Sequence, residues 1–252
     1  MNYKTNSIFI EEIVEFLNSF FDVKRFSESE RGGIYLPSRH PVKRLGLALE
    51  ANANLQEWII SQSLDALFIH RPWKLEVESL PSELGIISYH LPFDECLTMS
   101  FNPRLAQVLS ISDLEMLGEK ENRVIGMIGN IPIQKFEHLC NCVTQVFGGQ
   151  EQVYPITNND VKRVAVVGAM TDLLIREAAD RDADVYITGQ FRKPATGAIQ
   201  ETQMGVIAVG HHRSEAWGLR ALAGVLRERW LNLDVVISPN ILGKPDSYKV
   251  EG

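Results

Sequence analysis

The sequence predicts an α/β protein made of two similar halves, with mixed or parallel sheets and flanking helices. Apolar runs of strand length alternate with segments of helical periodicity, which is typical of βαβ units with parallel strands. Residues 44–74 also align without gaps with residues 163–193, and this second occurrence of the unit indicates an internal repeat. Finally, a His-x-x-x-acid spacing follows an apolar run in each half, at His90 and Asp94 and again at His211 and Glu215.

Composition limits the class of protein. The chain has 252 residues, 45% of them hydrophobic and 23% charged, which is ordinary for a soluble globular protein of one large or two modest domains. The net charge of −7 argues against a nucleic-acid binder, which normally has a basic face. Three cysteines without a spacing framework favour a reducing compartment. The chain lacks an apolar signal-peptide core at its start and any run long enough to span a membrane, so we expect a cytoplasmic protein.

The first half is expected to cover residues 1–118. Hydrophobic periodicity predicts a helix over 8–21, a short strand over 34–36, a strand over 45–49, a helix over 52–63, and a strand over 64–69. The last of these strands leads directly into His70, and a further apolar run leads into His90.

The second half is expected to cover residues 119–252, although the halves could exchange terminal elements. The periodicity predicts helices over 102–109, between the halves, and over 134–147 and 214–230, with strands near 124–125 and over 164–168, 184–188, 206–209 and 233–237. Ser214 is expected to cap the last helix at its N-terminus, with Glu215 in the first turn.

Candidate ligands follow three of these strands. In open α/β sheets, ligands bind at the carboxyl ends of parallel strands, so side chains placed there are expected to converge. The candidates are His70, His90, Asp94, His211, His212 and Glu215. Imidazoles and carboxylates together suit Mn, Fe, Co, Ni or Zn rather than Ca or Mg, with one or two ions per chain. The alternative for each residue is structural, with the acids capping helices and His70 hydrogen-bonded in a loop.

Five motifs carry a resemblance to a known family. They are Asp65-Ala-Leu-Phe-Ile-His70, Tyr89-His-Leu-Pro-Phe-Asp94, Asn102-x-x-Leu-Ala106, Tyr186-Ile-Thr-Gly189 and Gly210-His-His-Arg-Ser-Glu215. From about Leu45 onward the chain resembles the short form of the Nif-three-like family, which includes dinuclear metal-centre proteins and GTP cyclohydrolase 1 type 2 homologs. The resemblance implies two similar α/β domains facing each other across a metal cleft, and assembly as a homohexamer.

The resemblance also assigns metal ligands. It implies that His70, Asp94, His211 and Glu215 bind metal. Relatives have two adjacent histidines after the first strand, whereas this chain has His70-Arg71. Arginine cannot serve as a ligand, so either one ion is weakened or lost, or Arg71 turns outward to bind substrate. Gln190 also stands where many relatives have an acid.

These residues predict a metal-dependent hydrolase-type protein acting on a small phosphorylated or nucleotide-like substrate. His90 or His212 would serve as a general base or would hold a metal ligand in place. Arg71, Arg192, Lys193 and Arg213 are candidates for binding an anionic group, or are solvated surface charges. GTP cyclohydrolase activity is implied by the resemblance alone. The alternative is a metal-binding or regulatory assembly protein without catalytic activity.

Overall fold

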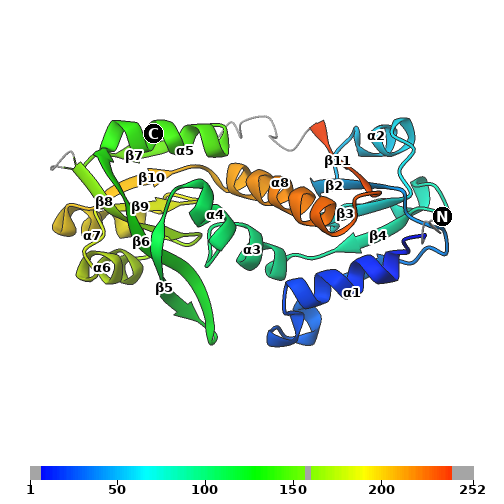
Figure 1. Cartoon of the computed structure of the whole chain (residues 1–252), viewed down its shortest axis with the longest axis horizontal. Helices are drawn as coiled ribbons and strands as arrows, with labels where there is room; N and C mark the ends of the chain where they lie inside the picture. The colour runs from blue at the N-terminus through cyan, green and yellow to red at the C-terminus, as the bar shows by residue number, and fades with distance from the viewer. Residues whose placement is uncertain (1–6, 157–159, 240–252) are drawn as a thin grey trace, which may run out of the picture. The chain divides into compact units, whose positions relative to one another are not determined.

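The structure is a computed structural model that describes residues 7–156 and 160–239 (Figure 1). It is an α/β protein with two mixed sheets and flanking helices, as the sequence predicts. Contacts divide the chain into two compact units. The first unit runs up to Phe93 and resumes at Leu219, and the second is Asp94–Gly218. The expected boundary after residue 118 separates the two halves of the sequence repeat, which are not the same as these contact units. That boundary stays a prediction.

The sheet of the first unit has the strand order β1–β4–β3–β2–β11. Its strands are β1 Gly33–Leu36, β2 Arg44–Glu50, β3 Ala66–Arg71, β4 Gly85–Ser88 and β11 Asp234–Ile237. The strands β2, β3, β4 and β11 run parallel, and β1 pairs antiparallel with β4 at the edge. The strand β3 extends further than expected, so that His70 and Arg71 are its last two residues.

Two helices cover opposite faces of this sheet (Figure 1). They are α1, Ile10–Phe20, and α2, Leu55–Ser61. Ile59 of α2 belongs to the same buried cluster as Ile69. Phe68 instead stacks on Tyr89, whose hydroxyl donates a hydrogen bond to Oδ1 of Asn18 in α1. Because successive side chains of a strand point to opposite faces, residue 70 belongs to the α1 face and residue 71 to the α2 face.

The sheet of the second unit has the strand order β5–β6–β8–β9–β10–β7. Its strands are β5 Ser112–Lys120, β6 Arg123–Lys135, β7 Gln152–Tyr154, β8 Asp160–Val167, β9 Val185–Thr188 and β10 Gly205–Ala208. The strands β8, β9 and β10 run parallel, and β5, β6 and β7 are paired antiparallel. The helix α5 (Phe136–Phe147) covers one face, and α6 (Asp172–Asp180) and α7 (Thr196–Thr202) cover the other (Figure 1).

Three further helices and four short turns complete the described chain. The helices are α3 Leu91–Leu97, α4 Pro103–Val108 and α8 His211–Arg229, and the 3-10 turns are η1 Val23–Arg25, η2 Glu28–Glu30, η3 Val77–Ser79 and η4 Lys193–Ala195. The chain passes from one unit to the other within α3 and again within α8. Among the described helices, none has both the length and the apolar character needed to cross a bilayer.

The internal repeat is visible in matching hydrogen bonds. In the first unit, Asp65 Oδ2 accepts from the backbone N–H groups of Lys43 and Arg44, both at 2.8 Å. In the second unit, Asp184 Oδ2 accepts from Lys162 and Arg163, at 2.8 and 3.0 Å. Each arginine also donates to a backbone carbonyl just after the following helix, that of Gln62 or that of Arg181. Identical residues at aligned positions therefore make the same contacts in β2–α2–β3 and β8–α6–β9.

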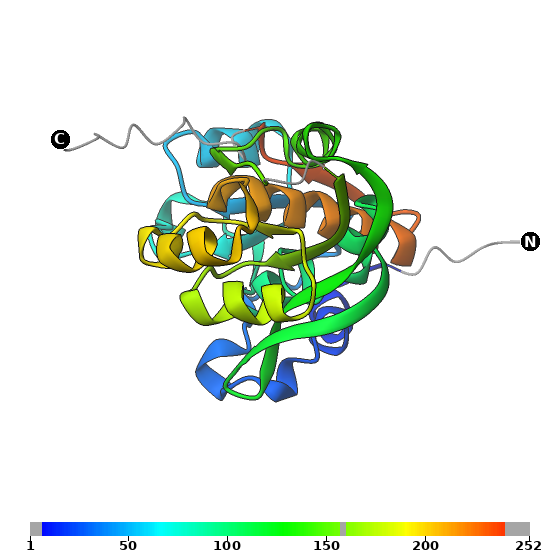
Figure 2. The same cartoon turned by 90° about the vertical axis from the view of Figure 1, so that its left-hand side faces the viewer.

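The expected strand near 124–125 is part of β6, which pairs with the unpredicted strand β5 in a long hairpin at the edge of the sheet, visible as a curved ribbon in Figure 2. One expectation, the start of the last helix, is corrected. The last helix begins at His211, three residues before the expected cap, and Ser214 lies inside it. The Ser214 hydroxyl donates to the carbonyl of His211 at 2.7 Å instead of accepting from backbone N–H groups. The helix starts early because Gly210, with φ of +100°, turns the chain directly after β10.

Candidate metal centre

His70 is the buried member of the candidate centre. It lies near the end of β3 and is fully buried, with its ring packed against Phe93 at a centroid distance of 4.7 Å. Its Nδ1 atom lies 3.0 Å from the carbonyl oxygen of Tyr89. A carbonyl oxygen can only accept, so Nδ1 must carry the proton and donate. In the neutral ring the lone pair is therefore on Nε2, as a metal ligand requires.

Tyr89 is itself held firmly by its neighbours. Its hydroxyl donates to Oδ1 of Asn18 at 2.7 Å, and its ring stacks on Phe68 and packs against Phe21. Burial raises the pKa of the Tyr89 phenol well above its usual range. Tyr89 is thus a packing residue whose backbone carbonyl orients His70.

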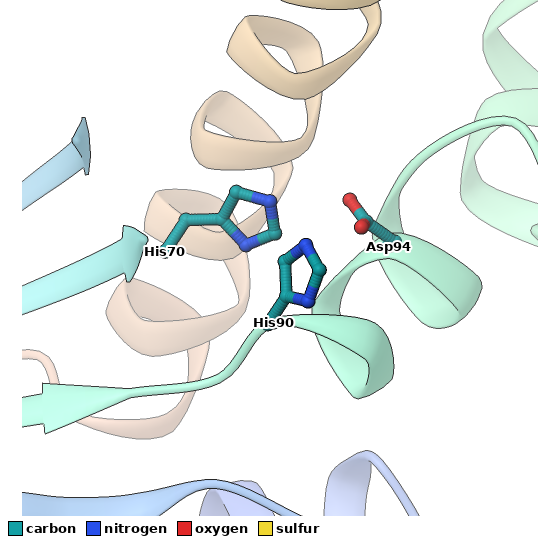
Figure 3. Close-up of side chains that lie close together, drawn as sticks. All are labelled: His70, His90 and Asp94. Atoms are coloured by element: carbon teal, nitrogen blue, oxygen red, sulfur yellow. The ribbon is translucent and has the colours of Figure 1, made fainter. Parts of the chain in front are cut away.

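His90 and Asp94 complete a cluster with His70. His90 follows β4, and Asp94 lies four residues later in α3, so one continuous backbone segment sets their separation. One ligand atom from each of the three residues lies within 4.8 Å of the others. Figure 3 shows the three side chains pointing toward one another. The His70 and His90 rings are 4.9 Å apart between centroids. The structure therefore groups His90, expected to serve catalysis, with the candidate ligands.

The donor set of this cluster fits a transition metal ion. Two imidazoles and one carboxylate match the ligands of catalytic zinc and of related ions, and three protein ligands leave a coordination position open. Ligands about 2.0–2.2 Å from a shared ion lie closer together than 4.8 Å, so small side-chain rotations would complete the coordination. His90 is exposed and Asp94 half-buried, which gives an ion and its substrate access. The cluster could thus hold a metal.

Arg71 points away from this cluster. Since it alternates with His70 along β3, its side chain belongs to the opposite face of the sheet. Its Nε lies 3.5 Å from Oε2 of Glu50 on the neighbouring strand β2, and its side chain is only 10% exposed. The negative charge of Glu50 offsets part of the positive charge that Arg71 would bring near the centre.

His211 and Glu215 form a second pair of candidate ligands, in the first turns of α8. Nε2 of His211 lies 2.9 Å from Oε1 of Glu215, and the two side chains are 59% and 1% exposed. This pair belongs to the second contact unit, as does the half-buried His212. Glu215 is the fifth residue of α8 and lies beyond the first turn in which it was expected; its carboxylate faces an imidazole.

The other three basic candidates have different surroundings. Arg192 and Lys193 are exposed in the segment that follows β9 and begins η4. Arg213 donates from Nη1 to Oε1 of Glu151 and to the carbonyl of Val209, both at 3.3 Å. All three residues belong to the second unit, whereas His70 belongs to the first.

Sequence reasoning missed a cavity beside His90. It has a volume of about 380 Å³ and is lined by residues of the first unit. The lining comes from residues 29–30 and 32–35, from Pro72 and Trp73, and from Ser88, His90 and Leu91 at and after the end of β4. The Trp73 ring meets the His90 ring edge-on, with centroids 5.3 Å apart. The sequence offered one signal for this cavity, the pair Pro72-Trp73 directly after the strand that contains His70. No pattern in residues 29–35 indicated that this segment contributes to a cavity.

The chain is similar to known proteins over most of its length. A family model described as Duf34/NIF3 (NGG1p interacting factor 3) matches residues 8–241. A protein from Pyrococcus abyssi named GTP cyclohydrolase 1 type 2 homolog is 26% identical over 238 residues, which are 87% of this chain and 94% of that relative. A protein of the same name from Allochromatium vinosum is 23% identical over 240 residues, 88% of this chain and 92% of the relative.

Solved structures share the fold. Reduced HcgD from Methanocaldococcus jannaschii superposes with a TM-score of 0.71 at 19% identity, covering 92% of this chain and 98% of its own. A protein from Thermus thermophilus, TTHA1606, gives a TM-score of 0.70 at 22% identity, covering 90% of this chain and 96% of its own.

Proposed function

Since the chain belongs to the Duf34/NIF3 family, we propose that it is a metal-dependent hydrolase acting on a small phosphorylated or nucleotide-like substrate. Curated relatives bear the name GTP cyclohydrolase 1 type 2 homolog, which supports the nucleotide-like class. The observation that carries the proposal is the orientation of His70. Its Nδ1 donates a hydrogen bond to the Tyr89 carbonyl, so the lone pair that can bind a metal is on Nε2. His90 and Asp94 lie beside His70 as further ligands.

The chain's own residues would perform distinct tasks. His70, His90 and Asp94 would hold one divalent ion of Zn, Fe, Mn, Co or Ni, and His211 and Glu215 are proposed as further ligands. A bound ion would lower the pKa of a water molecule and polarise the scissile group of the substrate. His212 is the proposed proton acceptor, since an imidazole is the most common general base in enzymes. The proposal retains Arg71, Arg192, Lys193 and Arg213 as candidates for holding an anionic group.

A direct test measures metal content and turnover together. Metal per chain is determined for the wild type, for Asp94→Asn and for the matched control Asp182→Asn, whose carboxylate is exposed in the second unit. We expect Asp94→Asn to lose metal and hydrolysis of phosphoesters or nucleotides, and Asp182→Asn to retain both. A wild-type chain that binds no transition metal would overturn the proposal.

The second candidate is a metal-binding or regulatory assembly protein without catalytic activity. Arg71 favours it, because the residue next to His70 is paired with Glu50 and adds no ligand. Metal binding without turnover over a broad substrate panel would support this candidate. A homohexamer is proposed for either function, and light scattering of the purified chain would test it.

A further inference from the structure

The cavity beside His90 has a lining with a distinct chemistry. Apolar side chains that are unusually exposed gather there: Trp73 is 71% exposed, Tyr35 47% and Ile34 40%. Exposed aromatic rings of this kind offer flat faces on which a planar ring can stack. Large apolar groups kept in contact with water at a cavity often mark a binding site.

The polar part of the lining carries negative charge. Glu30 contributes a carboxylate, and Ser27 holds it in place by donating from Oγ to Oε2 at 2.8 Å. Among the described residues that line the cavity, none is a lysine or an arginine. A phosphate group placed in it would meet the Glu30 charge without a compensating cation. A carboxylate instead pairs well with a ligand that presents N–H donors.

The backbone of one wall is shaped by a glycine. Gly32 has φ of +74°, and a Cβ atom there would lie 2.4 Å from the carbonyl oxygen of Ser88. Only glycine allows the segment before β1 to pass so close to the end of β4. This close approach brings Glu30 and Tyr35 to the same cavity as His90.

We infer that this cavity binds a planar nitrogen heterocycle, which stacks on Trp73 and directs ring N–H donors to the carboxylate of Glu30. The inference deepens the proposed function and rests on it, because it specifies the part of the substrate that is recognised beside the candidate metal ligand His90. A nucleobase-type ring fits this chemistry, whereas an isolated sugar phosphate does not.

The test measures binding in the presence of a chelator, so that it requires neither metal nor turnover. Guanosine is the probe because its ring edge offers adjacent N–H donors; 1-methylguanosine, which lacks one of them, and ribose 5-phosphate are compared with it. Titration calorimetry with the full chain should show saturable binding of guanosine, weaker binding of 1-methylguanosine, and none of ribose 5-phosphate.

Substitutions test which side chains contact the bound guanosine. We expect Trp73→Ala to weaken guanosine binding about tenfold or more, as loss of a stacking platform does. Leu231→Ala, at an exposed apolar residue outside the cavity, should leave it unchanged. Glu30→Gln should remove the preference for guanosine over its methylated analogue. Circular dichroism spectra that match the wild type show that each variant is folded.

Three outcomes would overturn the inference: no saturable guanosine binding, ribose 5-phosphate binding as tightly as guanosine, or unchanged affinity in Trp73→Ala. Loss of concentration-dependent self-association in Trp73→Ala, without guanosine binding, would also overturn it and identify the apolar patch as an interface between copies. Failure of the proposed hydrolase function would appear separately, as missing metal or missing turnover in a chain that still binds guanosine.

Discussion

The Nδ1 atom of His70 lies 3.0 Å from the carbonyl oxygen of Tyr89, so the ring donates to the backbone on one side and presents Nε2 on the other. The two residues come from adjacent parallel strands, His70 from β3 and Tyr89 from the residue after β4. A bond of this kind fixes both the tautomer and the orientation of a metal-binding imidazole. The pairing of β3 with β4 therefore prepares the centre before any ion binds.

The first prediction concerns the double role of His70. His70→Ala removes a buried ring that packs on Phe93, and it leaves the Tyr89 carbonyl without its donor. We expect the free energy of unfolding to fall by about 2–4 kcal/mol, together with loss of bound metal. Chemical denaturation and metal analysis would measure both. The control His40→Ala, at an exposed residue, should change stability by less than about 0.5 kcal/mol. Equal effects of the two substitutions would refute a special role for His70.

The second prediction tests the pair in α8. Glu215 is buried and lies against His211, and the proposal makes both residues metal ligands. We expect Glu215→Gln to lower the metal content per chain, because an amide is a weaker ligand than a carboxylate. Glu151→Gln is the control, since Glu151 is exposed and contacts Arg213 in the same unit. If metal content is the same in both variants, Glu215 is not a ligand.

The third prediction concerns the repeat. Asp65→Ala and Asp184→Ala each remove a carboxylate oxygen that accepts two backbone N–H bonds in equivalent places. We expect each substitution to destabilise its unit by about 1–3 kcal/mol, and the two losses to add in the double variant. Asp172→Ala, at an exposed aspartate in the first turn of α6, should cost much less. Hydrogen exchange measured for each unit would give the loss of stability that each substitution causes. A large loss of stability for only one of the two substitutions would contradict equivalent roles.

The fourth prediction is a pH dependence. Hydrogen bonds from Arg163, and then from Arg181, hold the pKa of Glu115 below its usual value. A carboxyl group whose pKa is lower in the folded than in the unfolded state stabilises the fold above its unfolded pKa. This contribution is lost as the pH falls through the folded pKa. We therefore expect Glu115→Gln to lower the melting temperature at neutral pH, and the difference from wild type to shrink in acid. The exposed Glu57→Gln is the control; a difference that grows in acid would refute the assigned cause.

Several elements could be predicted because their signals are local. Apolar runs predicted β2, β3, β8, β9, β10 and β11, and helical periodicity predicted α1, α2 and α5. The strand β5 was missed because most of its side chains are exposed and it lacks an apolar run. The start of α8 was misplaced because His211, His212 and Arg213 are polar and carry no helical periodicity. The family match confirms the resemblance that the sequence motifs indicated.

The sequence by itself determined the α/β class, the repeat, the family and the strand ends beside which His70 and His90 stand. These follow from patterns along the chain, which need no knowledge of neighbours in space. Only the tertiary structure decided which nitrogen of His70 carries the proton and which can bind a metal, because that depends on the chain segment adjacent to β3. The tertiary structure also turned Arg71 toward Glu50 and assembled the cavity with Glu30, Tyr35 and Trp73. Such contacts join residues far apart in sequence, so no local pattern could predict them.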